Sequence, residues 1–120
     1  MAVMSNPTES AQSVIDAYIE GTRTRDVGLL KAVFAEGAVM VGWLGPDLLT
    51  GGPEPFYGAL EANEVGDDYA ARSTVEVTDR IATATIEEQN LLGMNFTNHF
   101  QIVQLADGSW RIAAKLFRHH

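Results

Sequence analysis

The spacing of apolar residues changes part-way along the chain, and this change limits the folds that the sequence can adopt. Before about residue 70, apolar side chains recur every three or four positions, the repeat of an amphipathic helix. After that point they recur at every second position, the repeat of a strand with one buried face. Helices followed by a run of strands predict an α+β fold, with the helices packed on one face of a curved antiparallel sheet.

Three helices are expected in the first part. The first has Asn6 as its N-cap and ends at Gly21. A shorter second helix is expected from about Asp26 to Gly37, and a third after the segment 51–53, Gly-Gly-Pro. The first helix carries the apolar stripe Ala11, Val14, Ile15, Tyr18 and Ile19.

The strands are bounded by turn sequences. One is expected over residues 38–44, before the Gly-Pro-Asp turn at 45–47, and the others lie within 71–78, 82–87, 96–103 and 110–117. The last two strands carry large apolar residues on both faces, with Val103 opposing Ile102 and Leu116 opposing Phe117. This predicts a homodimer formed through the outer face of the sheet. A β-bulge that switches the alternation is the other explanation.

Length and charge narrow the class of protein. The 120 residues are expected to form one domain over 1–120, with 1–6 as a flexible tail. Sixteen acidic against eight basic residues give a net charge of −8, which argues against a nucleic-acid partner and against an anionic membrane surface. Five of the acids fall between Glu54 and Asp68 without a base, which indicates a solvated face.

The chain has no cysteine, so thiolate catalysis and cysteine zinc sites are excluded. The adjacent His119 and His120 lack a third ligand, and neither a metal nor another cofactor is expected. The N-terminal residues have no basic and apolar pattern of a secretory signal, and no apolar run is long enough to span a bilayer. A cytoplasmic protein is the expectation.

The sequence resembles the nuclear transport factor 2-like superfamily, which includes SnoaL-like cyclases and ketosteroid isomerases. Within it, the small bacterial proteins labelled putative lumazine-binding are the most similar. The resemblance covers roughly residues 10–118, and it implies a cone: a strongly bent antiparallel sheet closed by three helices, usually dimeric, with an apolar pocket inside. The residues that carry it are 14–19 (Val-Ile-Asp-Ala-Tyr-Ile), Arg25-Asp26, 29–34, the strand from Ala38, Asn98-His99-Phe100, Asp107 to Ile112, and Lys115-Leu116-Phe117.

The resemblance also implies where an isomerase would place its catalytic groups. The helix-one tyrosine falls on Tyr18, the protonated strand acid falls on Asn98, and the general base falls on Gly42. Moving a proton beside a carbonyl needs a base as well as donors for the developing enolate. Glycine carries no proton, and Asp47 lies in a turn, so the sequence favours binding over catalysis.

The leading hypothesis is therefore a small-molecule-binding domain for an apolar or planar ligand. An isomerase, lyase or cyclase that uses Tyr18 and Asn98 as oxyanion donors is the alternative. Lys115 shares a strand face with Phe117, where it would attract an anionic or carbonyl-bearing ligand, pair with a carboxylate such as Asp16, or extend to the rim. The expected pocket residues are Tyr18, Trp43, Phe56, Asn98, Phe100, Lys115 and Phe117, while His99 is expected on the opposite face.

Overall fold

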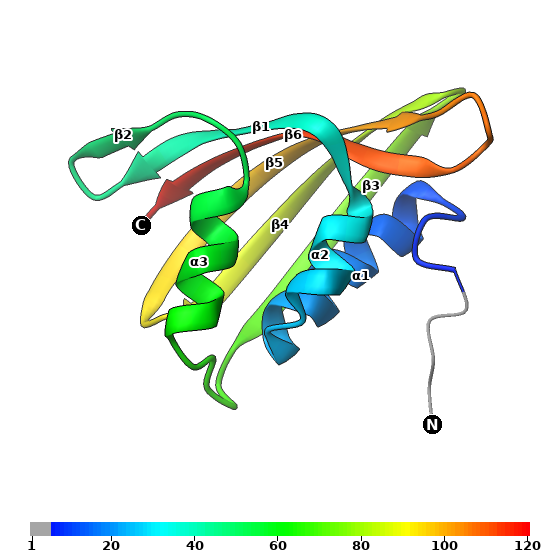
Figure 1. Ribbon diagram of the computed structural model, residues 1–120. Helices are drawn as coiled ribbons and strands as arrows, with labels where there is room; N and C mark the ends of the chain where they lie inside the picture. Colours follow the sequence, from blue (N-terminus) through cyan, green and yellow to red (C-terminus); the bar gives the residue numbers. More distant parts are fainter. Residues whose placement is uncertain (1–5) are drawn as a thin grey trace.

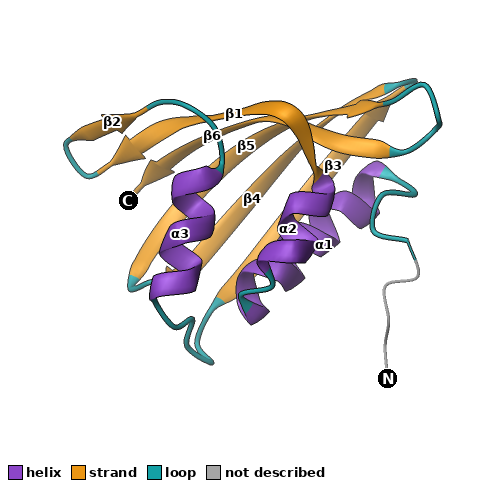
Figure 2. Cartoon of the chain, in the orientation of Figure 1, coloured by secondary structure: helices purple, strands orange, loops and turns teal. Residues whose placement is uncertain are grey.

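A curved six-stranded sheet with three helices on its concave side forms the protein in a computed structural model that describes residues 6–120 (Figures 1 and 2). The predicted α+β class is confirmed. The predicted tail 1–6 lies, except for Asn6, outside the described residues. The elements are α1 (Ala11–Thr24), α2 (Val27–Val33), β1 (Phe34–Leu44), β2 (Asp47–Leu49), α3 (Glu54–Ala62), β3 (Ala70–Thr78), β4 (Ile81–Leu91), β5 (Met94–Gln104) and β6 (Trp110–His119).

The sheet is mixed. Its strand order is β2-β1-β6-β5-β4-β3, so the last strand of the chain lies between β1 and β5. Strands β1 and β6 run parallel, and the other neighbouring pairs are antiparallel. The parallel pair is possible because α3 and four strands separate β1 from β6 along the chain, far more than a tight turn. The sequence did not predict this pair, nor the short strand β2 that folds back on β1.

The first helix begins later and ends later than expected. Its N-cap is Ser10, whose Oγ accepts a hydrogen bond from the backbone N of Ser13, while the Ser13 hydroxyl accepts one from the N of Ser10. Asn6 instead accepts from Thr8 in the turn before the helix. The helix continues through Gly21, where a Cβ would come within 2.9 Å of Leu30 Cγ, so this glycine serves the close packing of α1 on α2.

The second and third helices begin where the sequence predicts. Asp26 caps α2 by accepting from the backbone N of Leu29, and α3 follows the Gly-Gly-Pro segment 51–53. Helix α2 ends at Val33 and not near Gly37, because β1 already begins at Phe34. Gly37 has a φ of +76° and lies where the pairing of β1 with β6 is irregular.

A β-bulge in β6 sets which side chains face the helices. Gln101 pairs with Ala114 and Ile102 pairs with Ile112, so Ala113 is an extra residue between them. Before the bulge Ile112 faces the core, and after it Lys115 does. The bulge that the sequence offered as the other explanation for the two-faced strand is thus present, although Leu116 still lies on the outer face and is 54% exposed.

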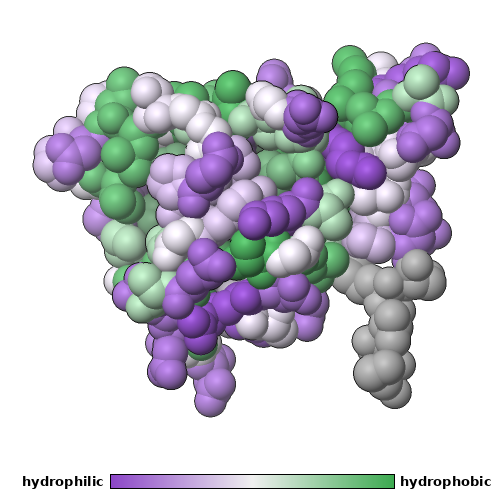
Figure 3. Space-filling view, in the orientation of Figure 1, coloured by the Kyte–Doolittle hydropathy of each residue, from purple (hydrophilic) through white to green (hydrophobic). Residues whose placement is uncertain are grey.

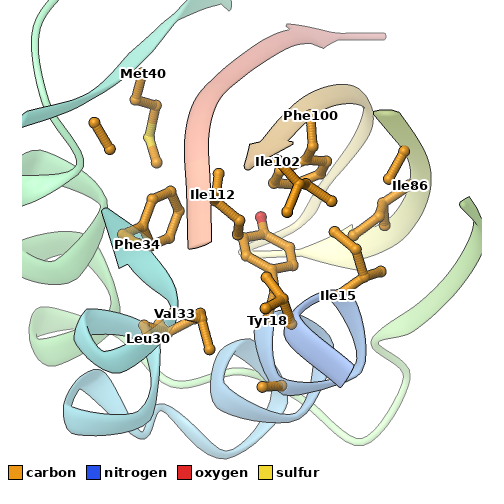
Figure 4. Packing of buried hydrophobic residues seen from close by; sticks show 14 of the residues in the cluster. Ile15, Tyr18, Leu30, Val33, Phe34, Met40, Ile86, Phe100, Ile102 and Ile112 are labelled. Carbon is orange, nitrogen blue, oxygen red and sulfur yellow. The ribbon is translucent and has the colours of Figure 1, made fainter. Parts of the chain in front are cut away.

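Tyr18 lies at the centre of the buried core, between the helices and the sheet (Figure 4). Its ring meets Phe100 edge to face, with centroids 4.9 Å apart, and stacks on Phe56 of α3 at 5.8 Å. These contacts join α1 to β5 and to α3. The hydroxyl of Tyr18 therefore points at the sheet from a fixed position.

The described residues also show where the acidic side chains lie and whether a helix could cross a membrane. The five acids between Glu54 and Asp68 are all exposed, as the sequence predicts. No helix in residues 6–120 has the length and apolar character needed to cross a membrane.

The first prediction concerns Gly42, which pairs with Phe117 of β6. A Cβ at this position would overlap the carbonyl oxygen of Phe117 and come within 2.5 Å of its ring. We expect Gly42→Ala to lower the free energy of unfolding by about 1–3 kcal/mol in urea denaturation. Gly58→Ala is the matched control, since a Cβ on that exposed face of α3 meets nothing within 4 Å and should raise stability by about 0.5–1 kcal/mol. Equal effects of the two substitutions would contradict the packing argument.

Candidate functional site: a cavity between helix α3 and the sheet

A cavity of about 320 Å³ is lined by side chains of α3 and of the sheet. Helix α3 and strand β2 lie at the same end of the molecule (Figure 1). The wall of the cavity is almost entirely apolar, and Glu88 and Lys115 are the charged residues in it. Figure 3 shows apolar surface gathered over this end of the molecule. The lining residues are Met40, Leu44, Leu49, Thr50, Gly52, Pro55, Phe56, Ala59, Glu88, Leu91, Leu92, Phe96, Lys115 and Phe117.

Lys115 is a buried base, with 4% of its surface exposed. Its Nζ donates a hydrogen bond of 2.8 Å to the hydroxyl of Tyr18 and lies 4.4 Å from the ring centroid of Phe56. The ring faces around it attract a cation. The lysine does not extend to the rim, and it does not pair with Asp16, which is exposed and accepts from Gln12 on the surface of α1.

This buried environment shifts the pKa values of Lys115 and Tyr18. Burial lowers the pKa of Lys115 to about 8, although the carboxylate of Glu88 acts in the opposite direction. Burial, together with the negative charge of Glu88, raises the pKa of Tyr18 well above its usual value. The lysine thus loses its proton more easily than an ordinary lysine, and the tyrosine keeps its proton.

Glu88 is the acceptor that the sequence analysis missed. It is 2% exposed, and its two carboxylate oxygens accept hydrogen bonds from Tyr69 Oη at 2.7 Å and from Asn98 Nδ2 at 2.8 Å. The alternation of β4 contained the signal, because Glu88 lies two residues beyond the inward-facing Ile86. Tyr69 precedes the strand β3, and no periodic pattern marks it.

Asn98 has its two amide hydrogens committed within the protein. They go to Glu88 Oε1 and to the carbonyl oxygen of Ile86, the latter at 3.1 Å. Within residues 6–120 its Oδ1 has no hydrogen-bond partner. Asn98 therefore has an acceptor to spare and no donor, which is the reverse of what an oxyanion hole requires.

The predicted pocket residues fall into three groups. Phe56, Lys115 and Phe117 line the cavity. Tyr18, Asn98 and Phe100 are buried in the adjoining core, where they hold Lys115 and Glu88 in place. Trp43 does not line the cavity, since it lies on the outer face of β1 and is 51% exposed. His99 is exposed on the outer face, as the sequence predicts.

The position of the isomerase base has no room for a side chain. Gly42 is buried, and the ring and carbonyl of Phe117 occupy the space that a Cβ would need. The same ring forms part of the cavity wall. The aromatic side chain thus stands where a catalytic carboxylate at residue 42 would have to project.

The sequence profile of the family described as Putative lumazine-binding matches residues 6–118. The chain belongs to the Putative lumazine-binding family. A comparison with curated proteins finds no match.

Several solved structures have a similar fold. An NTF2-like protein of unknown function from Shewanella baltica has a TM-score of 0.82 at 20% identity, over 91% of this chain and 90% of that one. A putative ketosteroid isomerase from Parabacteroides distasonis has a TM-score of 0.69 at 13% sequence identity, and the match covers 100% of this chain and 95% of that one. A cystatin-like fold protein from Burkholderia xenovorans has a TM-score of 0.69 at 18% sequence identity, and the match covers 90% of this chain and 87% of that one. At these identities the likeness establishes that this member of the Putative lumazine-binding family has the NTF2-like fold.

The buried lysine predicts an unusual dependence of stability on pH. Between pH 8 and 10 the unfolded chain keeps the Lys115 proton, with an ordinary pKa of 10.5, while the folded protein has released it. Unfolding then takes up a proton, so this group makes the free energy of unfolding rise with pH, by at most about 1.4 kcal/mol per unit. Above pH 10 the trend reverses, because Tyr18 and Tyr69 keep protons in the folded state that the unfolded chain loses.

Urea denaturation from pH 7 to 11 measures this effect. The Lys115→Met variant is the control, because it lacks the group and should lose the rise between pH 8 and 10. The opposite slope in the native protein, or an unchanged rise in the variant, would contradict the assignment.

Proposed function

We propose that this protein binds a small, flat, largely apolar molecule in the cavity between α3 and the sheet. The observation that carries the proposal is the composition of the wall: apolar side chains, aromatic rings of Phe56 and Phe117, and the charged pair Lys115 and Glu88. A cavity with few convergent polar groups is typical of sites for small ligands. The family description, which concerns lumazine, is consistent with a flat heteroaromatic ligand.

The polar groups of the wall indicate how such a ligand would be oriented. Lys115 has donors beyond the one that it gives to Tyr18, and each oxygen of Glu88 can accept a second hydrogen bond. Among the described residues the one ion pair joins Arg23 to Glu20, so Lys115 and Glu88 are not in direct contact. A ligand with a carbonyl toward Lys115 and an N–H toward Glu88 would satisfy both.

The alternative of an isomerase-like enzyme has less support. Gly42 supplies no base, and Asn98 has no free amide hydrogen for an oxyanion. Tyr18 is engaged with Lys115. We therefore propose binding as the function, while a cytoplasmic location stays a prediction.

Ligand binding can be tested with a panel of flat heteroaromatic compounds, lumazine included, by thermal shift and native mass spectrometry. We expect at least one compound to raise the Tm, since a ligand at a hundred times its Kd adds about 2.7 kcal/mol of stability. Ala59→Phe should abolish the shift by filling the cavity. Ala62→Phe, on an exposed position of the same helix, should keep it. Equal shifts in the two variants would place binding elsewhere, and no shift with any compound would refute the proposal.

We also propose that the outer face of the sheet pairs with a second copy of the chain. Adjacent positions of β1 and β6 present Val41 beside Leu116 and Trp43 beside Arg118 on this face. Trp43 and Leu116 are about half exposed. Large apolar groups that lie together on one sheet face are typical of an interface between subunits. Because the two copies are identical, the patch would meet itself across a twofold axis.

Light scattering of Leu116→Glu tests the dimer. We expect the native protein at micromolar concentration to have twice the mass of the 13.0 kDa chain, and the variant to be monomeric, because pairing of the two faces would remove a charged carboxylate from water within an apolar patch. Val77→Glu is the control: Val77 is 56% exposed but shares its sheet face with the buried Ala82, so dimerisation should persist. A monomeric native protein would refute the proposal.

A further inference from the structure

We propose that the side-chain amine of Lys115 is a nucleophile that forms an imine with aldehyde or ketone ligands in the cavity. This inference rests on the proposed binding function and gives the ligand a chemical class. It adds a covalent step to what binding alone requires.

The geometry supplies an amine that a ligand can reach. Lys115 is part of the cavity wall, and its Nζ lies between the ring of Phe56 and the hydroxyl of Tyr18. No carboxylate is in ion-pair contact with it among the described residues. A buried lysine that is not neutralised by a partner is the usual setting of an amine activated by desolvation.

The charged and titratable groups around Lys115 come from different elements. Tyr18 belongs to α1, Glu88 to β4, and Tyr69, just before β3, bonds to Glu88 behind the cavity wall. Helix α3 contributes the uncharged Phe56. With a pKa of about 8, half of the Lys115 amine is neutral at pH 8, about a hundredfold more than for an ordinary lysine.

The step balances without a further reactant. The lone pair of Nζ attacks the carbonyl carbon, the C–N bond forms, and the carbonyl π electrons move to oxygen, which takes a proton. The nitrogen then loses its protons as the C=N bond forms, and the former carbonyl oxygen leaves as water. The hydroxyl of Tyr18, which contacts Nζ, is placed to pass a proton between nitrogen and oxygen. No oxidant or reductant is involved.

The chain contains its own control, because Lys31 and Lys115 are its only lysines. Lys31 is exposed on α2. We would incubate the native protein with benzaldehyde and sodium cyanoborohydride at pH values from 6 to 9. The cyanoborohydride reduces any imine to a stable benzylamine. Peptide mapping separates the two lysines and the amino terminus. A benzylated Lys115 blocks tryptic cleavage at that site, so the label appears in the peptide Ile112–Arg118.

We expect Lys115 to be labelled at least about tenfold faster than Lys31 at pH 8, with a rate that rises toward pH 8 and then levels. Labelling of Lys31 at an equal or faster rate would overturn the inference. Because the comparison of Lys115 with Lys31 is made in the native protein, its result does not depend on whether a variant folds. Lys115→Arg should lose the label, while Lys31→Arg should keep it on Lys115.

Benzyl alcohol separates this inference from the proposed function, because it has the same ring but no carbonyl. If it raises the Tm and slows any labelling by benzaldehyde, the cavity binds the ring. A shift with benzyl alcohol but no label on Lys115 would refute the nucleophile and leave binding intact. Lys115 could instead be labelled fast at a rate that benzyl alcohol does not slow. The amine would then react without the ring being bound in the cavity, and the inference would be overturned.

Discussion

The buried contact between Lys115 and Tyr18 joins the parts of the structure that form the cavity. Lys115 comes from β6, Tyr18 from α1, and the Phe56 ring beside the lysine from α3. Removing an ammonium group from water is unfavourable unless its surroundings compensate. Here one hydrogen bond, three ring faces and the opposite charge of Glu88 compensate in part, and the lowered pKa shows that the compensation is incomplete. The positions of helix, strand and cavity wall are therefore coupled through one amine.

Two backbone features allow this contact. The extra residue Ala113 shifts the alternation of β6, so that Lys115 and Phe117 face the helices although Ile112 does so earlier in the same strand. Gly42 on β1 then leaves space for the ring of Phe117. Without the bulge, the pairing of Ile112 with Ile102 would continue so that Ala114 opposes Phe100, and Lys115 would lie on the outer face. Without the glycine, β1 and β6 would be forced apart beside the cavity.

Periodicity was enough to predict the helices and most strands, because each depends on local spacing along one element, and the inward position of Asn98 was inferred from the resemblance. The parallel pairing of β1 with β6 depends on contacts between segments far apart in the sequence, which no local pattern encodes. Lys115 and Phe117 were placed correctly only by resemblance. Trp43 was misplaced because the alternation of β1 fixes two faces but does not say which one is inside. Glu88 was overlooked although the alternation of β4 points it inward.

The charge of the cavity differs from that of the whole molecule, and this difference bears on the ligand. The net charge of −8 resides largely on exposed acids, such as those between Glu54 and Asp68, where water screens them. The cavity wall instead carries one basic and one acidic group. An anionic ligand would gain from Lys115 but would be repelled by Glu88 in a medium of low dielectric constant. A neutral ligand that presents an acceptor to Lys115 and a donor to Glu88 avoids that penalty, so local charge favours neutral carbonyl compounds over acids.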